Sequence, residues 1–262
     1  MTPGDAQGPL GPEPAALGRR ILHLREVDST QDHLRRLAEA GAPHGTVVWA
    51  DEQTRGRGRR GARWEARAGD ALLVSVLVRS PALPAAGAAL SLVWPLAALG
   101  VLARVLGRGA TERLAVKWPN DLLLDGGKLM GVLVEGVEGG AVVGAGLNLA
   151  LPPDAPKERA QLGVPVDREG LLHALLKAWD GASRIALERG FAPFRPLYRT
   201  VLAYRGEAVA LATESGSELG RLCDVDPQGR LVLETPGGRR AFWAGEVQRL
   251  RPGEEDPRAA PP

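Results

Sequence analysis

The sequence predicts an α+β fold, and three observations indicate this class. Residues 85–107 form a long apolar segment that is typical of a helix packed against a sheet. Shorter apolar segments at 46–50 and 71–78 have the length and composition of strands. After Gly206 the pattern changes to four short strand candidates separated by glycine and proline turns. This last pattern indicates a small barrel-like module of about fifty residues.

Caps and turns locate the other elements. Asp28, followed three residues later by Gln31, predicts a capping box, and Gly41 predicts the end of that helix. Asp167 predicts the N-cap of a second helix, which ends near Gly190. In chain order we expect strands at 21–27, 46–50 and 71–78, the apolar helix at 85–107, strands at 114–118, 122–124, 128–135 and 141–151, helices at 168–190 and 193–204, and strands at 208–212, 219–225, 231–234 and 240–244.

Length and composition set the domain organisation. The 262 residues suffice for one large domain and a small appended one, and we expect these at 19–204 and 205–251. Residues 1–18 are rich in Pro, Gly and Ala. Together with the similar tail at 252–262, they are expected to be disordered.

Composition also argues against several kinds of protein. A net charge of +2 argues against a general nucleic-acid coat protein. The single cysteine, Cys223, allows neither an intrachain disulfide nor a cysteine-based metal site. The four histidines lack metal-ligand spacing. We find no secretory signal and expect no membrane-spanning segment, so a cytoplasmic location is predicted.

The segment Gly56-Arg57-Gly58-Arg59-Arg60-Gly61 is the strongest functional signal. Glycine allows close approach of a ligand to the backbone, and arginine offers a planar fork of donors for phosphate or carboxylate. The spacing also fits the dinucleotide fingerprint, but no apolar-faced helix opens after it, and the P-loop pattern is absent. We predict a loop that closes over an anion, with an unliganded surface loop as the alternative.

A second signal lies at Lys117-Trp118-Pro119-Asn120-Asp121 and Lys128. Lys128 opens a strand directly after the predicted Asp125-Gly126-Gly127 turn, where its ammonium can reach a phosphate or carboxylate. Taken alone, a lysine at a hairpin end is an ordinary surface residue, and Asn and Asp are ordinary turn formers.

In combination, the motifs resemble those of the biotin–protein ligases. The similarity extends in order from about residue 20 to residue 250, and it implies a catalytic domain with a mixed sheet and an SH3-like β-barrel after it. The matching stretches are Asp28-Ser29-Thr30-Gln31, Gln53-x3-Arg57-Gly58-Arg59-Arg60-Gly61-x2-Trp64, Lys117-Trp118-Pro119-Asn120-Asp121 with Lys128-x2-Gly131, and Gly144-x-Gly146-x-Asn148.

The resemblance also implies a reaction and its residues. Biotin and ATP, with Mg²⁺, give biotinyl-5′-AMP and pyrophosphate, and a lysine of a biotin carboxyl carrier domain then takes the biotinyl group. The implied biotin-binding residues are Ser29, Thr30, Gln31, Gln53, Arg57, Gly58, Arg59, Lys128 and Gly131. The implied ATP and adenylate residues are Arg57, Arg59, Arg60, Trp64, Lys117, Asn120 and Asn148. Lys128, Arg59 and Asp121 are the implied catalytic residues, and Asp121 is also the implied Mg²⁺ ligand.

Other functions stay open at this point. A lipoate or octanoate ligase or transferase has the same catalytic fold, although the two motifs disfavour it. An Arg-loop module that binds nucleic acid is a second alternative, but the interleaved aromatic platform is lacking. Many bacterial relatives carry an N-terminal DNA-binding helix-turn-helix. The residues before the first predicted strand are too few for it, so no DNA partner is expected. A homodimer through an exposed sheet edge is left open.

Overall fold

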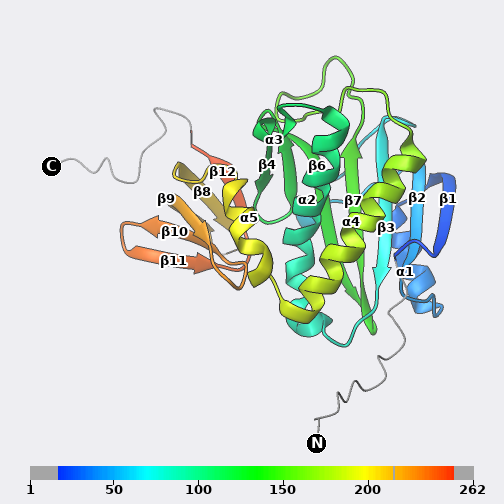
Figure 1. Cartoon of the computed structure of the whole chain (residues 1–262), viewed down its shortest axis with the longest axis horizontal. Coiled ribbons are helices and arrows are strands. Elements are labelled where there is room, and N and C mark those ends of the chain that lie inside the picture. The colour runs from blue at the N-terminus through cyan, green and yellow to red at the C-terminus, as the bar shows by residue number, and fades with distance from the viewer. Residues whose placement is uncertain (1–16, 215, 251–262) are drawn as a thin grey trace, which may run out of the picture.

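The chain forms two β-sheets, which lie side by side in Figure 1. The computed structural model describes residues 17–214 and 216–250. Within them, the larger sheet has seven strands in the order β1-β2-β3-β7-β6-β5-β4, and the smaller has five in the order β11-β10-β9-β8-β12. Only the β1–β2 pair is parallel among the strand pairs of these two sheets, so the larger sheet is mixed, as predicted.

The elements of the larger sheet and its helices occupy the first 200 residues. The strands are β1 (Arg20–Val27), β2 (Thr46–Gln53), β3 (Ala71–Val78), β4 (Leu114–Lys117), β5 (Asp121–Leu124), β6 (Gly127–Val137) and β7 (Gly140–Asn148). The helices are α1 (Thr30–Glu39), α2 (Leu83–Leu106), α3 (Ala110–Arg113), α4 (Arg168–Arg189) and α5 (Arg195–Thr200), with 3-10 turns η1 (Arg59–Gly61) and η2 (Ala192–Phe194).

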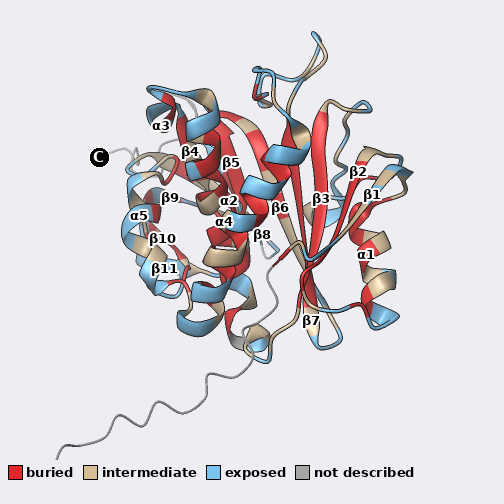
Figure 2. Cartoon of the chain, turned by 45° about the vertical axis from the view of Figure 1, so that its right-hand side comes forward, coloured by how far each residue is buried: buried red, intermediate tan, exposed pale blue. Residues whose placement is uncertain are grey.

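Helices cover both faces of the larger sheet. On one face α1 packs against β2, β3 and β7, and on the other α2 packs against β6 and against α4. Figure 2 shows the central strands buried beneath these layers, whereas α4 exposes one side to solvent. Because β3 is covered on both faces, all of its residues are buried, which explains why its sequence is apolar at every position except Ser75.

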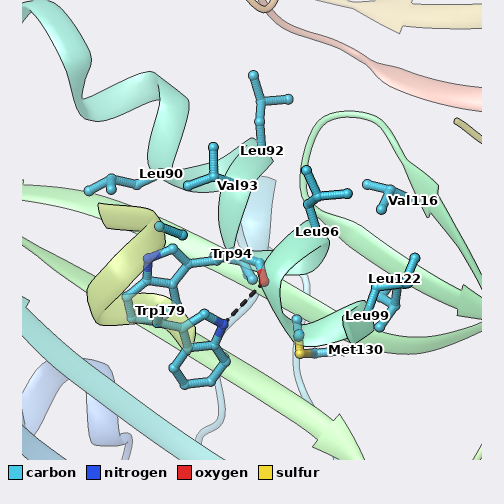
Figure 3. Close-up of a cluster of buried hydrophobic side chains, with 14 of the residues drawn as sticks. Leu90, Leu92, Val93, Trp94, Leu96, Leu99, Val116, Leu122, Met130 and Trp179 are labelled. Carbon is cyan, nitrogen blue, oxygen red and sulfur yellow. Dashed lines mark hydrogen bonds between the residues drawn. The ribbon is translucent and has the colours of Figure 1, made fainter. Parts of the chain in front are cut away.

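Two stacked tryptophans lie at the centre of the core between α2 and α4. The rings of Trp94 and Trp179 are 4.3 Å apart and inclined by 6°. Trp179 Nε1 donates to the backbone oxygen of Trp94 at 3.1 Å, the bond drawn in Figure 3. Trp94 Nε1 donates in turn to Ser183 Oγ at 3.0 Å. Both indole N–H groups are therefore satisfied inside an apolar cluster.

Most predicted elements are present, and one cap is corrected. Ser29, rather than Asp28, is the N-cap of α1, because its hydroxyl accepts a hydrogen bond from the N–H of Asp32. The Asp28 carboxylate instead accepts from the N–H of Ser29 and from the guanidinium of Arg36. The β5–β6 hairpin is confirmed, with positive φ at Asp125 and Gly126 as a type I′ turn requires.

The smaller sheet follows the predicted strands with one addition. Its strands are β8 (Ala208–Thr213), β9 (Gly216–Val225), β10 (Leu231–Thr235), β11 (Gly238–Phe242) and β12 (Glu246–Arg249). Strand β12 was not predicted, because Val247 is its one buried residue and the apolar pattern is weak. Strands β11 and β12 form the two edges, and no strand pair among the described residues closes the sheet into the predicted barrel.

One apolar helix of the described part has the length of a membrane span. Within the described residues, Ala86–Leu106 of α2 is long and apolar enough to cross a membrane by length and composition, with mean hydropathy 1.9. Its most apolar window is 61% buried. The packing of α2 between the sheet and α4 accounts for that composition.

The predicted terminal extensions fall mostly outside the described residues. Residues 1–16 and 251–262 are not described. Leu17, which was assigned to the first extension, is buried, and its N–H donates to Asp180 Oδ1 at 3.1 Å.

Candidate active site

A cavity lies on the α1 side of the sheet, over its central strands. Two rows of cross-strand neighbours form its floor. One row joins Ser75, Gly144 and Leu133, and the other joins Leu73, Gly146 and Gly131. Asp121 is the cross-strand neighbour of Gly131 and continues the second row beyond the cavity lining. The rows are two residues apart along each strand, which corresponds to about 7 Å. Glycine at three of these positions keeps side chains out of the space above the sheet.

Hydroxyls and amides gather at the first row. Thr30 donates to Gln53 Oε1 through its backbone N–H at 2.8 Å and through its hydroxyl at 3.0 Å. Ser75 Oγ lies 3.0 Å from Thr30 Oγ1 and donates to Gln31 Oε1 at 3.1 Å. The Gln53 oxygen is therefore occupied, and the two N–H donors of its Nε2 amide are what this side chain can offer a ligand.

Lys128 and Asp121 lie at the second row. Lys128 Nζ is 2.8 Å from Asp121 Oδ1 and 5.7 Å from the ring centre of Trp64. The carboxylate belongs to a buried residue, whereas the Lys128 side chain is 38% exposed. This end of the cavity therefore presents the Lys128 ammonium, which is already paired with the Asp121 carboxylate.

Arg59 brings a second cation toward the same end. Its Nη1 donates to Asn120 Oδ1 at 2.8 Å, and Asn120 Nδ2 donates to Val132 O at 2.7 Å. Burial lowers the pKa of Arg59, and the charge of Asp121 partly opposes this effect. A guanidinium stays protonated despite such a shift, so the group acts as a fixed positive charge in a partly dry environment.

Trp64 covers the glycines of the second row. A Cβ at Gly146 would be 2.5 Å from Trp64 Cε2, and one at Gly131 would be 3.2 Å from Trp64 Cζ3. The buried indole Nε1 has no hydrogen-bond partner among the described residues. The cavity volume is about 50 Å³, far below the ~300 Å³ of a typical small-molecule pocket. Some of these side chains must therefore move to admit a bicyclic ligand.

Hydrogen bonds and ion pairs hold the Gly56–Gly61 loop across this cavity. Arg57 pairs with Asp32 of α1 and Glu135 of β6. Arg59 Nη2 and Arg60 Nη1 donate to the backbone oxygens of Gly245 and Ala212, at 3.5 and 3.2 Å, in the smaller sheet and its connections. The loop therefore contacts α1, the larger sheet and the smaller sheet at once.

Known proteins match the chain over almost its whole length. Residues 24–150 match the biotin/lipoate A/B protein ligase family, and residues 205–250 match the biotin protein ligase C-terminal domain. A biotin–[acetyl-CoA-carboxylase] ligase of Paracoccus denitrificans is 35% identical over 239 residues, which cover 86% of this chain and 98% of the relative. The chain belongs to the biotin/lipoate A/B protein ligase family.

Further relatives are also named as biotin ligases. A biotin–[acetyl-CoA-carboxylase] ligase of Mycobacterium tuberculosis is 36% identical over 242 residues, which cover 89% of this chain and 90% of the relative. The biotin protein ligase of Aquifex aeolicus in complex with biotin and ATP has a TM-score of 0.76 at 28% identity, over 89% of this chain and 99% of that chain. The resemblance and the fold class inferred from sequence are thus confirmed.

In this member of the family, the cavity gathers most of the residues implied by the resemblance. Lys117 ends β4 and is not part of the lining, and Arg60 points to the smaller sheet. Asn148 donates to the backbone oxygens of Lys128 and Ala160 and does not line the cavity. Those that do line it are Ser29, Thr30, Gln31, Gln53, Arg57, Gly58, Arg59, Trp64, Lys128 and Gly131.

Sequence reasoning missed three contributors. Ser75 is the one polar residue of an otherwise apolar strand, and that polarity was the available signal. Glu135 ends the quoted Lys128 strand but was assigned no role. Arg159 donates to Glu65 O at 3.0 Å and to Asn148 Oδ1 at 3.1 Å, which fastens the far end of the loop segment. No local pattern marks this last residue.

The site offers one carboxylate that could hold a Mg²⁺ ion. Among the described residues no group of three or more His, Cys, Asp or Glu side chains could hold a metal ion. Asp121 supplies one carboxylate, which is paired with Lys128. Because Mg²⁺ is commonly held by one or two carboxylates together with phosphate oxygens and water, Asp121 fits a Mg²⁺ that arrives with ATP.

Proposed function

We propose that this chain is an ATP-dependent biotin protein ligase that forms biotinyl-5′-AMP and transfers the biotinyl group to a lysine of a biotin carboxyl carrier domain. One observation carries the proposal. A single cavity joins a row of hydroxyls and amides to the Lys128–Asp121 pair, beneath a loop that brings in Arg59. Biotin has the matching polarity, with a ureido ring at one end and a carboxylate at the other.

The first row suits the ureido ring. The Gln53 Nε2 amide supplies donors for the ureido oxygen, and the hydroxyls of Thr30 and Ser75 exchange hydrogen bonds with the amide side chains around them. A neutral wall with donors left for the ligand accepts an uncharged polar group at little electrostatic cost. The apolar side chains of Leu73 and Leu133 line the space beside it.

The second row suits adenylation. A biotin carboxylate oxygen attacks the α-phosphorus of ATP, the bond to the β-phosphate bridging oxygen breaks, and pyrophosphate leaves. Two anions approach one another in this step, so fixed cations lower the barrier. Lys128 and Arg59 are held in place by Asp121 and Asn120. Mg²⁺, when bound with ATP, would supply further positive charge to the phosphates.

The covering loop suits the intermediate. A mixed anhydride of a carboxylic acid and AMP is hydrolysed by water, so it requires exclusion from solvent. Trp64 and the Gly56–Gly61 loop lie over the cavity and provide that cover. In the second step the amine of the acceptor lysine attacks the acyl carbon, AMP leaves with the bonding electron pair, and the amine loses a proton.

The names of two relatives support a partner for the chain. Two of them are named biotin–[acetyl-CoA-carboxylase] ligase, which supports the carrier domain of a biotin-dependent carboxylase as the acceptor for this chain. A cytoplasmic location, where ATP and such carboxylases occur, is part of the same proposal. A homodimer through a sheet edge stays an open alternative.

A direct assay separates this function from lipoate activation. Purified chain is incubated with ATP labelled at the α-phosphate and with biotin, lipoate or octanoate in turn, and acyl-AMP is resolved by chromatography. We expect labelled adenylate with biotin alone. Adenylate with lipoate or octanoate and none with biotin would contradict the proposal. Salt-sensitive RNA binding without adenylation would favour the nucleic-acid alternative.

A further inference from the structure

Arg57 bridges two elements through two carboxylates. Its Nη1 lies 2.6 Å from Asp32 Oδ1, and its Nη2 lies 2.8 Å from Glu135 Oε1. A further hydrogen bond from Nη1 reaches Glu135 Oε2 at 3.2 Å, so the Arg57–Glu135 contact is bidentate. This fork geometry is the most specific form of an arginine–carboxylate pair. We call Asp32, Arg57 and Glu135 the Arg57 latch.

The position of the latch is unusual for a surface ion pair. Asp32 belongs to α1 and Glu135 to β6, whereas Arg57 belongs to the loop that crosses between them. The Glu135 side chain is 21% exposed and also pairs with Arg35 Nη2 at 3.1 Å. Partial burial opposes protonation of Arg57, but the charges of Glu135 and Asp32 outweigh it and raise the pKa of Arg57.

The latch does not require a ligand. The guanidinium of Arg57 is occupied by protein carboxylates, so this group does not need biotin or a phosphate as its partner. The loop is nevertheless closed without a ligand, as the small volume of the cavity beneath it indicates. Asp32 and Glu135 therefore act on the loop itself.

We propose that Asp32 and Glu135 are positioning residues that hold the Gly56–Gly61 loop shut through Arg57 and so set the rate at which ligand enters and leaves the cavity. The proposal rests on the function proposed above. It assigns to two acidic side chains, which do not line the cavity, control over how long biotinyl-5′-AMP is retained.

This role has a distinct kinetic signature. A latch that closes the loop with and without ligand lowers the open fraction in both states. Because entry and release both require the open loop, loss of the latch raises the association and dissociation rates by the same factor and leaves Kd unchanged. Loss of a side chain that contacts the ligand changes mainly the dissociation rate.

The test uses the full chain with Glu135→Gln, Asp32→Asn and the double variant. Association and dissociation of biotinyl-5′-AMP are followed by stopped-flow tryptophan fluorescence, since Trp64 lines the cavity. We expect both rates to rise about tenfold in the double variant, a change that corresponds to ~1.4 kcal/mol. Glu39→Gln on α1 and Glu138→Gln after β6 are matched controls, because neither side chain contacts the loop in any described ion pair.

Two further measurements separate the latch from a general loss of stability, and the first of them needs no ligand. Trypsin cleavage at the loop arginines in the ligand-free chain reports the open fraction, and it should rise in the latch variants at an unchanged thermal midpoint. Raising NaCl from about 0.05 M to about 0.5 M should speed release from the parent and leave the double variant unaffected.

The outcomes are distinguishable. Unchanged rates in the double variant, or a rise in the dissociation rate alone, would overturn the latch. Failure of the parent chain to bind biotinyl-5′-AMP would instead refute the proposed function. Trypsin cleavage of the loop would then still decide whether Asp32 and Glu135 hold it closed, because that measurement uses the ligand-free chain.

Discussion

Lys128 Nζ lies 2.8 Å from Asp121 Oδ1, and the strand register explains why the two groups meet. Asp121 on β5 is the cross-strand neighbour of Gly131 on β6. A Cβ at Gly131 would lie 2.9 Å from Lys128 Cε, so glycine leaves room for the lysine side chain to fold back toward the carboxylate. An incoming carboxylate or phosphate competes with Asp121 for an ammonium that is already in position.

Lys128→Ala should suppress adenylate formation without unfolding the chain. The change removes a cation aimed at the reacting anions, and we expect the rate of pyrophosphate release to fall by about 10²–10³-fold. The partly exposed side chain contributes little to the core, so the circular dichroism spectrum should not change. Lys177→Ala, at an exposed position of α4, is the charge-matched control. A rate near that of the parent would show that Lys128 has no part in the reaction.

Gly146→Ala should weaken binding of biotinyl-5′-AMP. The new Cβ would lie 2.5 Å from Trp64 Cε2, which forces the indole out of its place over the cavity. Such overpacking typically costs about 1–3 kcal/mol, and calorimetric titration measures how much of it appears in affinity. Gly136→Ala on β6 is the control, because its Cβ would meet nothing within 4 Å. Equal effects of the two substitutions would argue against a specific role of the Trp64 contact.

Ser183→Ala should destabilise the core. Trp94 Nε1 would lose its acceptor at a buried position, which costs about 1–3 kcal/mol. Urea unfolding followed by circular dichroism gives the change in the free energy of unfolding. Ser91→Ala is the matched control, since that hydroxyl bonds the Ala88 oxygen in a more exposed part of α2. If both variants lose the same stability, the buried indole N–H is not the cause.

Asp28→Asn should lower the free energy of unfolding at neutral pH and have less effect in acid. Hydrogen bonds from Arg36, followed by the backbone N–H of Ser29, lower the pKa of Asp28 from 3.8 to about 2. A carboxyl whose pKa is depressed on folding stabilises the protein above its unfolded pKa and loses that effect as the pH falls through the folded value. After allowance for solvent screening, we expect the variant to be less stable by about 1 kcal/mol at pH 7.

The difference between parent and Asp28→Asn should fade between pH 4 and pH 2, as the parent carboxyl is protonated. Thermal unfolding at a series of pH values measures it. A constant difference across this range would mean that the stabilisation does not depend on the Asp28 charge.

The fold was predictable where burial or turn chemistry imposes a strong local pattern. Strand β3 is covered on both faces, so its apolar sequence marked its limits at Ala71 and Val78. The Asp125-Gly126 turn marked the β5–β6 hairpin because positive φ is required at both positions. Strand β12 left no such pattern, since three of its four side chains are exposed. The cap of α1 was misplaced by one residue because Asp28 and Ser29 are both good caps, and Arg36 decides between them.

The site residues likewise fall into those that a local pattern marks and those that it does not. Lys128 was predictable from its place after a turn, and the resemblance supplied its partners in the cavity. Ser75 and Glu135 were not assigned, because their roles depend on which strands become neighbours. The Arg57 latch joins residues 25 and 78 positions apart, and local periodicity carries no information on such distant pairs.

The contacts of Arg59 and Arg60 with the backbone of Gly245 and Ala212 have a mechanical consequence. The loop connects two strands of the larger sheet, but hydrogen bonds also attach it to the smaller sheet and its connections. A small rotation of one sheet against the other would therefore move the loop over the cavity, and with it Arg59 in the cavity lining. Residues around Ala212 and Gly245, which are remote from the biotin end of the cavity in the chain, thereby contribute to the position of the loop.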